Sequence, residues 1–197
     1  MEGGDADRLA RDEGVAFQNA AGDGDAERDA DLLREGGDRR RLAGVALLDI
    51  GEDQDVEFKS ADGGFPKSLW ESLSAFGNTE GGTIVLGVAE IGDQHEIAGV
   101  RTPARLIKTF WDSHNNTQKL STPICTGRDV SVTSIDGKDL IVVHVPRATR
   151  TQRPIFINGN PLAGTFKRNF EGDYHCTDAE VRQMLRDASA EPQDAGV

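Results

Sequence analysis

The run at residues 83–88 constrains the fold more than any other segment, because it is hydrophobic on both faces if it forms a strand. A strand with two hydrophobic faces lies inside a sheet that is covered on both sides. Residues 55–59 precede it and alternate hydrophobic with charged side chains, which is typical of a half-buried strand. We expect these two segments to be neighbouring strands of one sheet.

Three segments have the sequence features of helices. In residues 69–76 the large apolar side chains recur at helical spacing, and Gly77 is placed to end this helix. Residues 103–111 repeat the helical pattern. Thr177 and Glu180 have the spacing of a capping box, so a last helix is expected to begin there, with Val181, Met184 and Leu185 facing inward.

The second half of the chain predicts further strands. Residues 130–135 and 140–145 are strand-like and flank Asp136-Gly137, a dipeptide typical of a two-residue hairpin turn. Residues 154–157 and 164–167 are two shorter candidates. The predicted fold class is α+β, a single domain with one main mixed sheet and about three helices.

The two ends of the chain differ in composition from its middle. Residues 1–44 are acidic and rich in glycine, with few large apolar side chains, so we expect a largely disordered extension that contains short helices at most. The domain then occupies residues 45–188, and residues 189–197 form a disordered tail. Neither a secretory signal nor an apolar run near the roughly 20 residues of a membrane span is present in the sequence. We therefore expect a cytoplasmic protein without a membrane partner.

The net charge of −12 hides a basic segment. Residues 101–170 hold 11 lysines and arginines against 4 acids, a net charge of +7, whereas residues 51–100 hold 10 acids against 2 bases. A strongly basic segment beside an acidic one is compatible with nucleic-acid binding even in an acidic protein.

The cations of this segment cluster in two short stretches, with Phe166 and Phe170 beside the second. Such cations contact phosphates, and aromatic rings stack on bases. The alternative is a solvated loop next to phenylalanines of the core. The predicted nucleic-acid-binding residues are Arg147, Arg150, Arg153, Lys167 and Arg168.

Three carboxylates form a second candidate site. Glu57 and Lys59 share one face of their predicted strand, and Glu90 follows the end of the run at residues 83–88. With Glu52 they offer oxygen ligands suited to Mg²⁺ or Mn²⁺, which can activate a water for phosphodiester attack. On the residues alone, solvated surface carboxylates are the commoner explanation.

The glycines of residues 78–82 do not predict an ATP site. A phosphate-binding loop needs a helix that begins directly after the glycines, and this turn leads into a predicted strand instead. A tight connection between a helix and a strand is the favoured interpretation.

Several motifs in the same order resemble one known family. Glu52 and Glu57, the latter followed by Phe58-Lys59, come first, and residues 73–88 follow. Residues 145–154, 164–168 and 171–174 complete the pattern. Over about residues 45–188 the chain resembles the Schlafen-type, Alba-like (AlbA) domain, in its bacterial branch. The resemblance implies a nucleic-acid-binding domain.

In nuclease-active animal members, the resemblance implies a three-carboxylate site that cleaves transfer and ribosomal RNA. Its acids fall on Glu52, Glu57 and Glu90, although Glu90 stands where the family usually has aspartate and Ala89 replaces a common acid. Lys59 would neutralise the scissile phosphate or orient Glu57. Those nucleases use two such lobes and this chain has one, which implies a homodimer.

The leading hypothesis is therefore a nucleic-acid-binding domain that favours RNA, such as transfer RNA, with metal-dependent endoribonuclease activity. The alternative is a non-catalytic regulatory module that binds DNA or a protein and lacks a C-terminal effector domain. A third interpretation is a structural remnant of a larger regulator.

Overall fold

The computed structural model describes residues 55–61, 63–92, 94–170 and 172–189. These residues belong to one compact unit of the chain. The predicted extension at residues 1–44, the carboxylate Glu52 and the predicted tail beyond Ser189 lie outside the described residues. No described helix has the length and hydrophobicity needed to cross a membrane.

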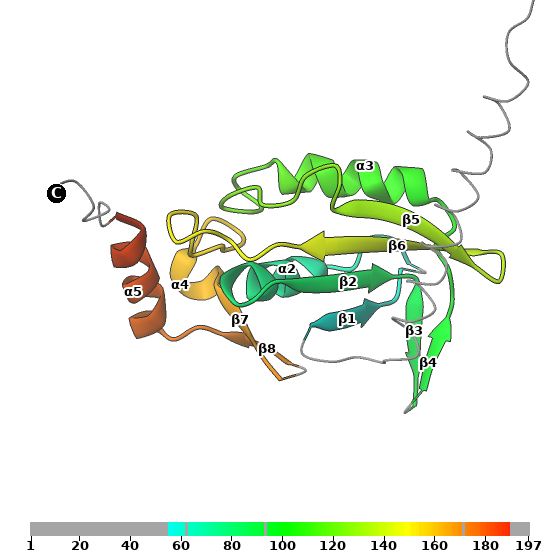
Figure 1. The fold of residues 1–197 in the computed structure, drawn as a ribbon, viewed down its shortest axis with the longest axis horizontal. Helices are drawn as coiled ribbons and strands as arrows, with labels where there is room; N and C mark the ends of the chain where they lie inside the picture. The colour runs from blue at the N-terminus through cyan, green and yellow to red at the C-terminus, as the bar shows by residue number, and fades with distance from the viewer. Residues whose placement is uncertain (1–54, 62, 93, 171, 190–197) are drawn as a thin grey trace, which may run out of the picture. The chain divides into compact units, whose positions relative to one another are not determined.

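A four-stranded sheet forms the centre of the fold, in the order β1-β2-β6-β5 (Figure 1). It consists of β1 (Val56–Lys59), β2 (Gly82–Leu86), β6 (Lys138–Val145) and β5 (Val130–Ile135). β1 runs parallel to β2, and the other neighbours are antiparallel. The structure confirms the α+β fold class and the expected pairing of the first two strands.

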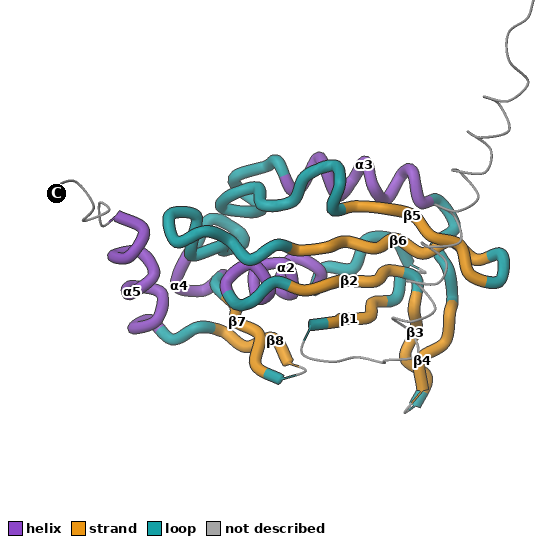
Figure 2. Tube along the Cα trace, viewed as in Figure 1, coloured by secondary structure: helices purple, strands orange, loops and turns teal. Residues whose placement is uncertain are grey.

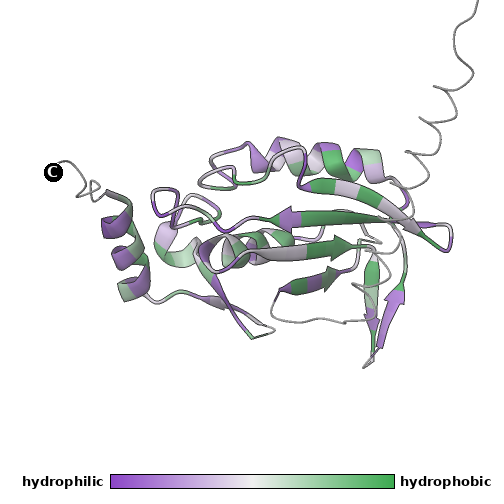
Figure 3. Cartoon of the chain, in the orientation of Figure 1, coloured by the Kyte–Doolittle hydropathy of each residue, from purple (hydrophilic) through white to green (hydrophobic). Residues whose placement is uncertain are grey.

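The two faces of this sheet are buried by different elements. Side chains of α2 (Leu69–Asn78) and α3 (Pro103–His114) share one core with alternate residues of β2 and β6, such as Ile84. A smaller cluster on the other face joins Phe58 and Val85 to Ile97. Hydrophobic residues therefore dominate β2 and β6 in Figure 3. Along α3, by contrast, hydrophobic and hydrophilic residues alternate.

The predicted strand at residues 83–88 ends two residues early, at Leu86. Gly87 has a φ of +102°, and a Cβ at this position would lie 2.8 Å from a methyl carbon of Leu140. The chain turns there and forms a hairpin of β3 (Val88–Ile91) and β4 (Gln94–Ile97) that the sequence analysis did not predict. Glu90 therefore lies on a hairpin outside the main sheet.

The first helix continues past its expected end at Gly77 and includes Asn78. A Cβ on Gly77 would lie only 2.8 Å from Cδ1 of Ile124, so the glycine permits close packing rather than ending the helix. The continuation matters because it places Asn78 in the interior, where the side chain is 5% exposed.

The predicted hairpin and capping box are confirmed. Asp136 and Gly137 both have positive φ, as a primed two-residue turn requires. α5 (Asp178–Ser189) begins directly after Thr177, whose amide donates to Glu180 Oε2 over 2.7 Å.

The two shorter strand candidates are only partly correct. A long loop follows β6 (Figure 2), and residues 154–157 form only isolated bridges, Phe156 with Thr165 and Ile157 with Leu120. The short helix α4 (Pro161–Gly164) comes next in the chain. The candidate at residues 164–167 overlaps β7 (Phe166–Asn169), which begins two residues later than predicted and forms a hairpin with β8 (Gly172–His175).

Candidate nucleic-acid interface

Glu57, on the edge strand β1, forms ion pairs with two cationic side chains. Its Oε1 lies 2.7 Å from Nζ of Lys59, and its Oε2 lies 2.6 Å from Nη1 of Arg168. The Glu57 side chain is 14% exposed, so these contacts are largely shielded from water. The strand alternation predicted from the sequence puts Glu57 and Lys59 on one face, and the β7 residue Arg168 reaches them from the other end of the chain.

The structure buries Arg168, which the sequence analysis grouped with the phosphate-binding cations. Its side chain is 2% exposed, Nη1 also lies 3.1 Å from Oδ1 of Asp173, and Nη2 donates to the Val56 carbonyl over 3.3 Å. Burial by itself lowers the pKa of Arg168, but Glu57 and Asp173 raise it above its ordinary value. The guanidinium therefore stays charged and joins β1 to the β7–β8 hairpin rather than facing solvent.

Asp173 is a member of this charged cluster that the sequence analysis missed. It lies directly opposite Arg168 in the β7–β8 register, and its Oδ2 accepts a hydrogen bond of 2.5 Å from Ser72 on α2. Asp173 belongs to the motif at residues 171–174 noted in the sequence, but no role was predicted for it because the hairpin that places it opposite Arg168 was not predicted. We name Glu57, Lys59, Arg168, Asp173 and Ser72 the charged cluster.

The described residues do not by themselves fit a divalent cation. They contain no group of three histidine, cysteine, aspartate or glutamate side chains placed to hold a metal ion. Both Glu57 oxygens already have cationic partners. Glu90 is exposed and pairs in register with His95, whose ring contacts Phe58 on the face of β1 opposite to Glu57. The third carboxylate, Glu52, lies outside the described residues.

The loop after β6 carries the exposed cations. The side chain of Arg147 is 48% exposed, and its Nη1 lies 2.9 Å from Oε2 of Glu80, which is itself 68% exposed. Arg150 is also exposed and donates to the backbone carbonyl of Asp187 on α5. Both arginines thus lie at the surface within four residues of each other.

Arg153 and Lys167 are partly exposed, and each lies close to residues of α5. Arg153 lines a cavity of about 50 Å³ with Arg150 and Asp187, and within the described part of the chain its buried Nε has no hydrogen-bond partner. Lys167 lies 2.5 Å from Glu180, a contact that raises the pKa of the lysine and contributes most to lowering that of Glu180 to about 2.

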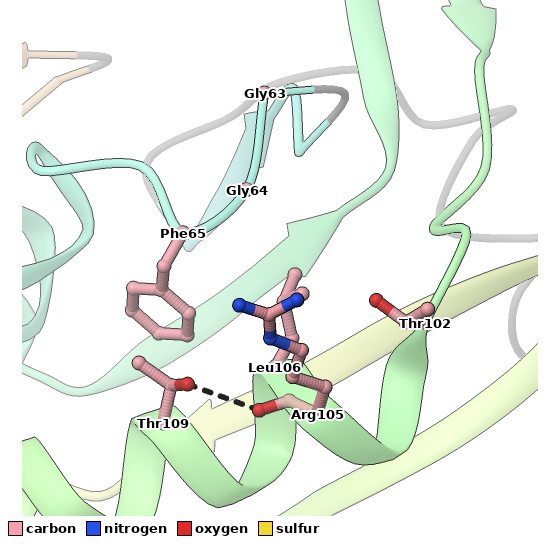
Figure 4. Close-up of a pocket in the computed structure, with 7 residues that line it drawn as sticks. All are labelled: Gly63, Gly64, Phe65, Thr102, Arg105, Leu106 and Thr109. Carbon is pink, nitrogen blue, oxygen red and sulfur yellow. Dashed lines mark hydrogen bonds between the residues drawn. The ribbon is translucent and has the colours of Figure 1, made fainter.

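A larger cavity of about 340 Å³ lies between the loop after β1 and the beginning of α3 (Figure 4). Gly63 and Gly64 form one side, and Phe65, Arg105 and Thr109 contribute side chains. None of these residues was predicted from the sequence to have a function. Their only joint feature in the sequence is the Gly-Gly pair, which carries no chemistry of its own.

The Schlafen, AlbA_2 family model matches residues 52–177. The solution NMR structure of the N-terminal domain of an ATP-dependent DNA helicase RecG-related protein from Nitrosomonas europaea is 27% identical, with a TM-score of 0.53, and the match covers 67% of this chain and 92% of that one.

A second solved structure shares the fold. The crystal structure of the DIP2311 protein from Corynebacterium diphtheriae is 16% identical, with a TM-score of 0.50. That match covers 79% of this chain and 34% of the other, so this chain spans about a third of its length. No curated protein matches the sequence.

Proposed function

Because this chain belongs to the Schlafen, AlbA_2 family, we propose that its domain binds nucleic acid, RNA in preference to DNA, through the loop after β6 and Lys167. The observation that carries the proposal is the pair of exposed arginines, Arg147 and Arg150, on one loop of an acidic protein. The name of the RecG-related relative supports an interaction with nucleic acid in general.

A phosphate can replace the acidic partners of these cations, because their exposed ion pairs are weak. Exposed ion pairs such as Arg147 with Glu80 contribute only about 0–1 kcal/mol, since water and salt screen both charges. A nucleic-acid phosphate can accept bidentate hydrogen bonds from the same guanidinium, and its binding releases condensed counterions. Exchange of Glu80 for a phosphate is therefore favourable. Arg168 is left out of this surface because it is buried.

Replacing Arg147 with alanine will flatten the salt dependence of RNA binding. Each phosphate contact that is lost reduces the slope of log K against log salt concentration by about 1. The measurement is a titration of the full chain with transfer RNA at several salt concentrations. Lys108→Ala is the matched control, since Lys108 is an exposed, ion-paired cation on α3, away from the loop.

Equal slopes for Arg147→Ala and the unmodified chain would contradict this surface. A steep slope that Lys108→Ala reduces and Arg147→Ala does not would move the contact to α3. Parallel titrations with DNA of the same length test the preference for RNA.

We propose in addition that the carboxylates act in metal-dependent RNA cleavage. Glu52, Glu57 and Glu90 would hold Mg²⁺ or Mn²⁺, which requires Glu57 to exchange one of its two cationic partners for the metal, and Lys59 would then meet the scissile phosphate. The support is the position of Lys59, 2.7 Å from Glu57 in a shielded site. Transfer RNA as the target, and a homodimer that supplies a second lobe, stay predictions. No cleavage step is assigned, because the described residues do not complete a cation site.

Incubation of transfer RNA with the full chain and Mn²⁺ is expected to give cleavage products that Glu57→Gln does not produce. Glu90→Gln provides an independent test, since Glu90 is exposed and outside the charged cluster, so that this variant keeps the fold. Thermal melting of each variant controls for folding. Products that persist with a chelator, or with both variants, would contradict the proposal.

A second candidate function is a non-catalytic module that binds DNA or a protein. The observation that favours it is the pairing of both Glu57 oxygens with Lys59 and Arg168, which gives this carboxylate a structural role. Such a module would retain nucleic acid equally well with and without divalent ions.

A further inference from the structure

The β7–β8 hairpin has one buried and one outward face. Arg168 and Asp173 lie opposite each other on the buried face, which contacts α2 (Figure 1). Strand alternation puts their neighbours on the outward face, where Lys167 lies opposite Tyr174 and Asn169 lies opposite Gly172. The outward face therefore combines an ammonium group, an amide and an aromatic ring.

Two aromatic rings are exposed on this hairpin. Phe170, at the turn, is 77% exposed, and Tyr174 is 55% exposed. Phe170 has a φ of +52°, which a bulky side chain rarely adopts, so neither its backbone nor its burial explains a phenylalanine here. Phe166, by contrast, is a core residue at 6% exposure.

The local backbone sets the orientation of the tyrosine. A Cβ at Gly172 would lie 2.6 Å from Cε2 of Tyr174, so the ring lies against the glycine backbone and a larger residue would displace it. The charged cluster fixes the strand beneath the ring, because Asp173 is bonded to both Arg168 and Ser72. The Tyr174 ring therefore has a defined position on the surface of the hairpin.

We propose that Phe170 and Tyr174 are a stacking surface for unpaired bases of a bound nucleic-acid strand. This inference rests on the proposed nucleic-acid binding and narrows its ligand to single-stranded segments. The occupant follows from the chemistry of the face. Lys167 is the register partner of Tyr174, and a phosphate can replace Glu180 in its partly exposed ion pair, while Asn169 offers an amide to a base edge. Bases splayed out of a strand stack on aromatic side chains in this way, and paired bases do not.

The sequence offers a direct probe, because Tyr174 is the only tyrosine of the chain. Full-length protein grown with 3-fluorotyrosine has a single ¹⁹F resonance, which reports on this ring alone. We expect that resonance to shift on addition of single-stranded oligouridylate. An abasic strand of equal length supplies the phosphates without the bases and leaves the resonance unshifted.

Affinity measurements complete the test. Phe170→Ala and Tyr174→Ala are each expected to weaken binding of the single strand about tenfold, at the lower end of the stacking contribution of a base. Ile91→Ala is the matched control, since Ile91 is 59% exposed on the other hairpin. Binding of duplex RNA serves as the reference that the two variants leave unchanged.

The results of these experiments distinguish failure of the stacking surface from failure of the proposed nucleic-acid binding. An equal shift with the abasic strand, or binding that both aromatic variants leave intact, overturns the stacking surface while nucleic-acid binding stands. Retention of neither single strands nor duplex at low salt overturns both.

Discussion

Replacing Arg168 with alanine will lower the free energy of unfolding by about 3–5 kcal/mol, the range for breaking a buried ion pair from one side. The substitution leaves the carboxylates of Glu57 and Asp173, each 14% exposed, without the guanidinium between them. It also removes the cation 5.1 Å above the Phe76 ring centroid. The β7–β8 hairpin loses its main tie to β1.

Urea denaturation of the full chain measures this effect. Lys108→Ala, at an exposed ion pair, is the control and is expected to change stability by about 0.5 kcal/mol at most. In the double variant Arg168→Met with Asp173→Asn, only Glu57 keeps a charge that has lost Arg168 as its partner. The double variant is therefore expected to lose less unfolding free energy than the sum of the losses in Arg168→Met and in Asp173→Asn. Additive losses, or an Arg168→Ala midpoint equal to that of the control, would contradict the role given to the cluster.

Replacing Asn78 with alanine will destabilise the domain by about 3 kcal/mol, because several buried backbone groups lose their partner at once. The Asn78 amide donates to the carbonyls of Ile155 and Phe166 over 2.8 and 2.9 Å, and its oxygen accepts from the Ile155 amide over 2.8 Å. Neighbouring Ser74 still reaches the Ile155 carbonyl, but not the Ile155 amide.

Thermal and urea unfolding of Asn78→Ala test this prediction, with Asn169→Ala as the control at an exposed asparagine. Asn78→Asp keeps the acceptor for the Ile155 amide but turns a buried carboxylate oxygen toward the two carbonyls, so it is expected to destabilise at least as much as Asn78→Ala. A change for Asn78→Ala no larger than that for Asn169→Ala would show that these hydrogen bonds are replaced by water.

The elements predicted correctly are those whose signal is local. Asp136-Gly137 produced the expected hairpin because both residues accept positive φ, and Thr177 with Glu180 produced the expected helix start because the capping partners are three residues apart. The two-sided hydrophobicity of residues 83–88 placed β2 in the interior of the sheet, although Gly87 ended the strand early.

The errors arise where a residue serves a distant contact. Gly77 was interpreted as a helix end, yet it is a point of close approach to Ile124, 47 positions later in the chain. Leu185 was expected to face inward with Val181, but it is 42% exposed because α5 buries only a narrow strip of its surface. Nothing within a few residues of either position contains that information.

The candidate site shows the same division. The sequence by itself determined the strand, the face and the charge of Glu57 and Lys59, since alternation and residue type fix all three. Only the tertiary structure decided that Arg168, from a strand more than a hundred residues later, is buried against Glu57 while Arg147 and Arg150 remain at the surface. The five predicted nucleic-acid-binding residues cannot be told apart in the sequence, because positive charge is a property of each residue alone. Their burial and ion pairing depend on which distant segments the folded core brings together.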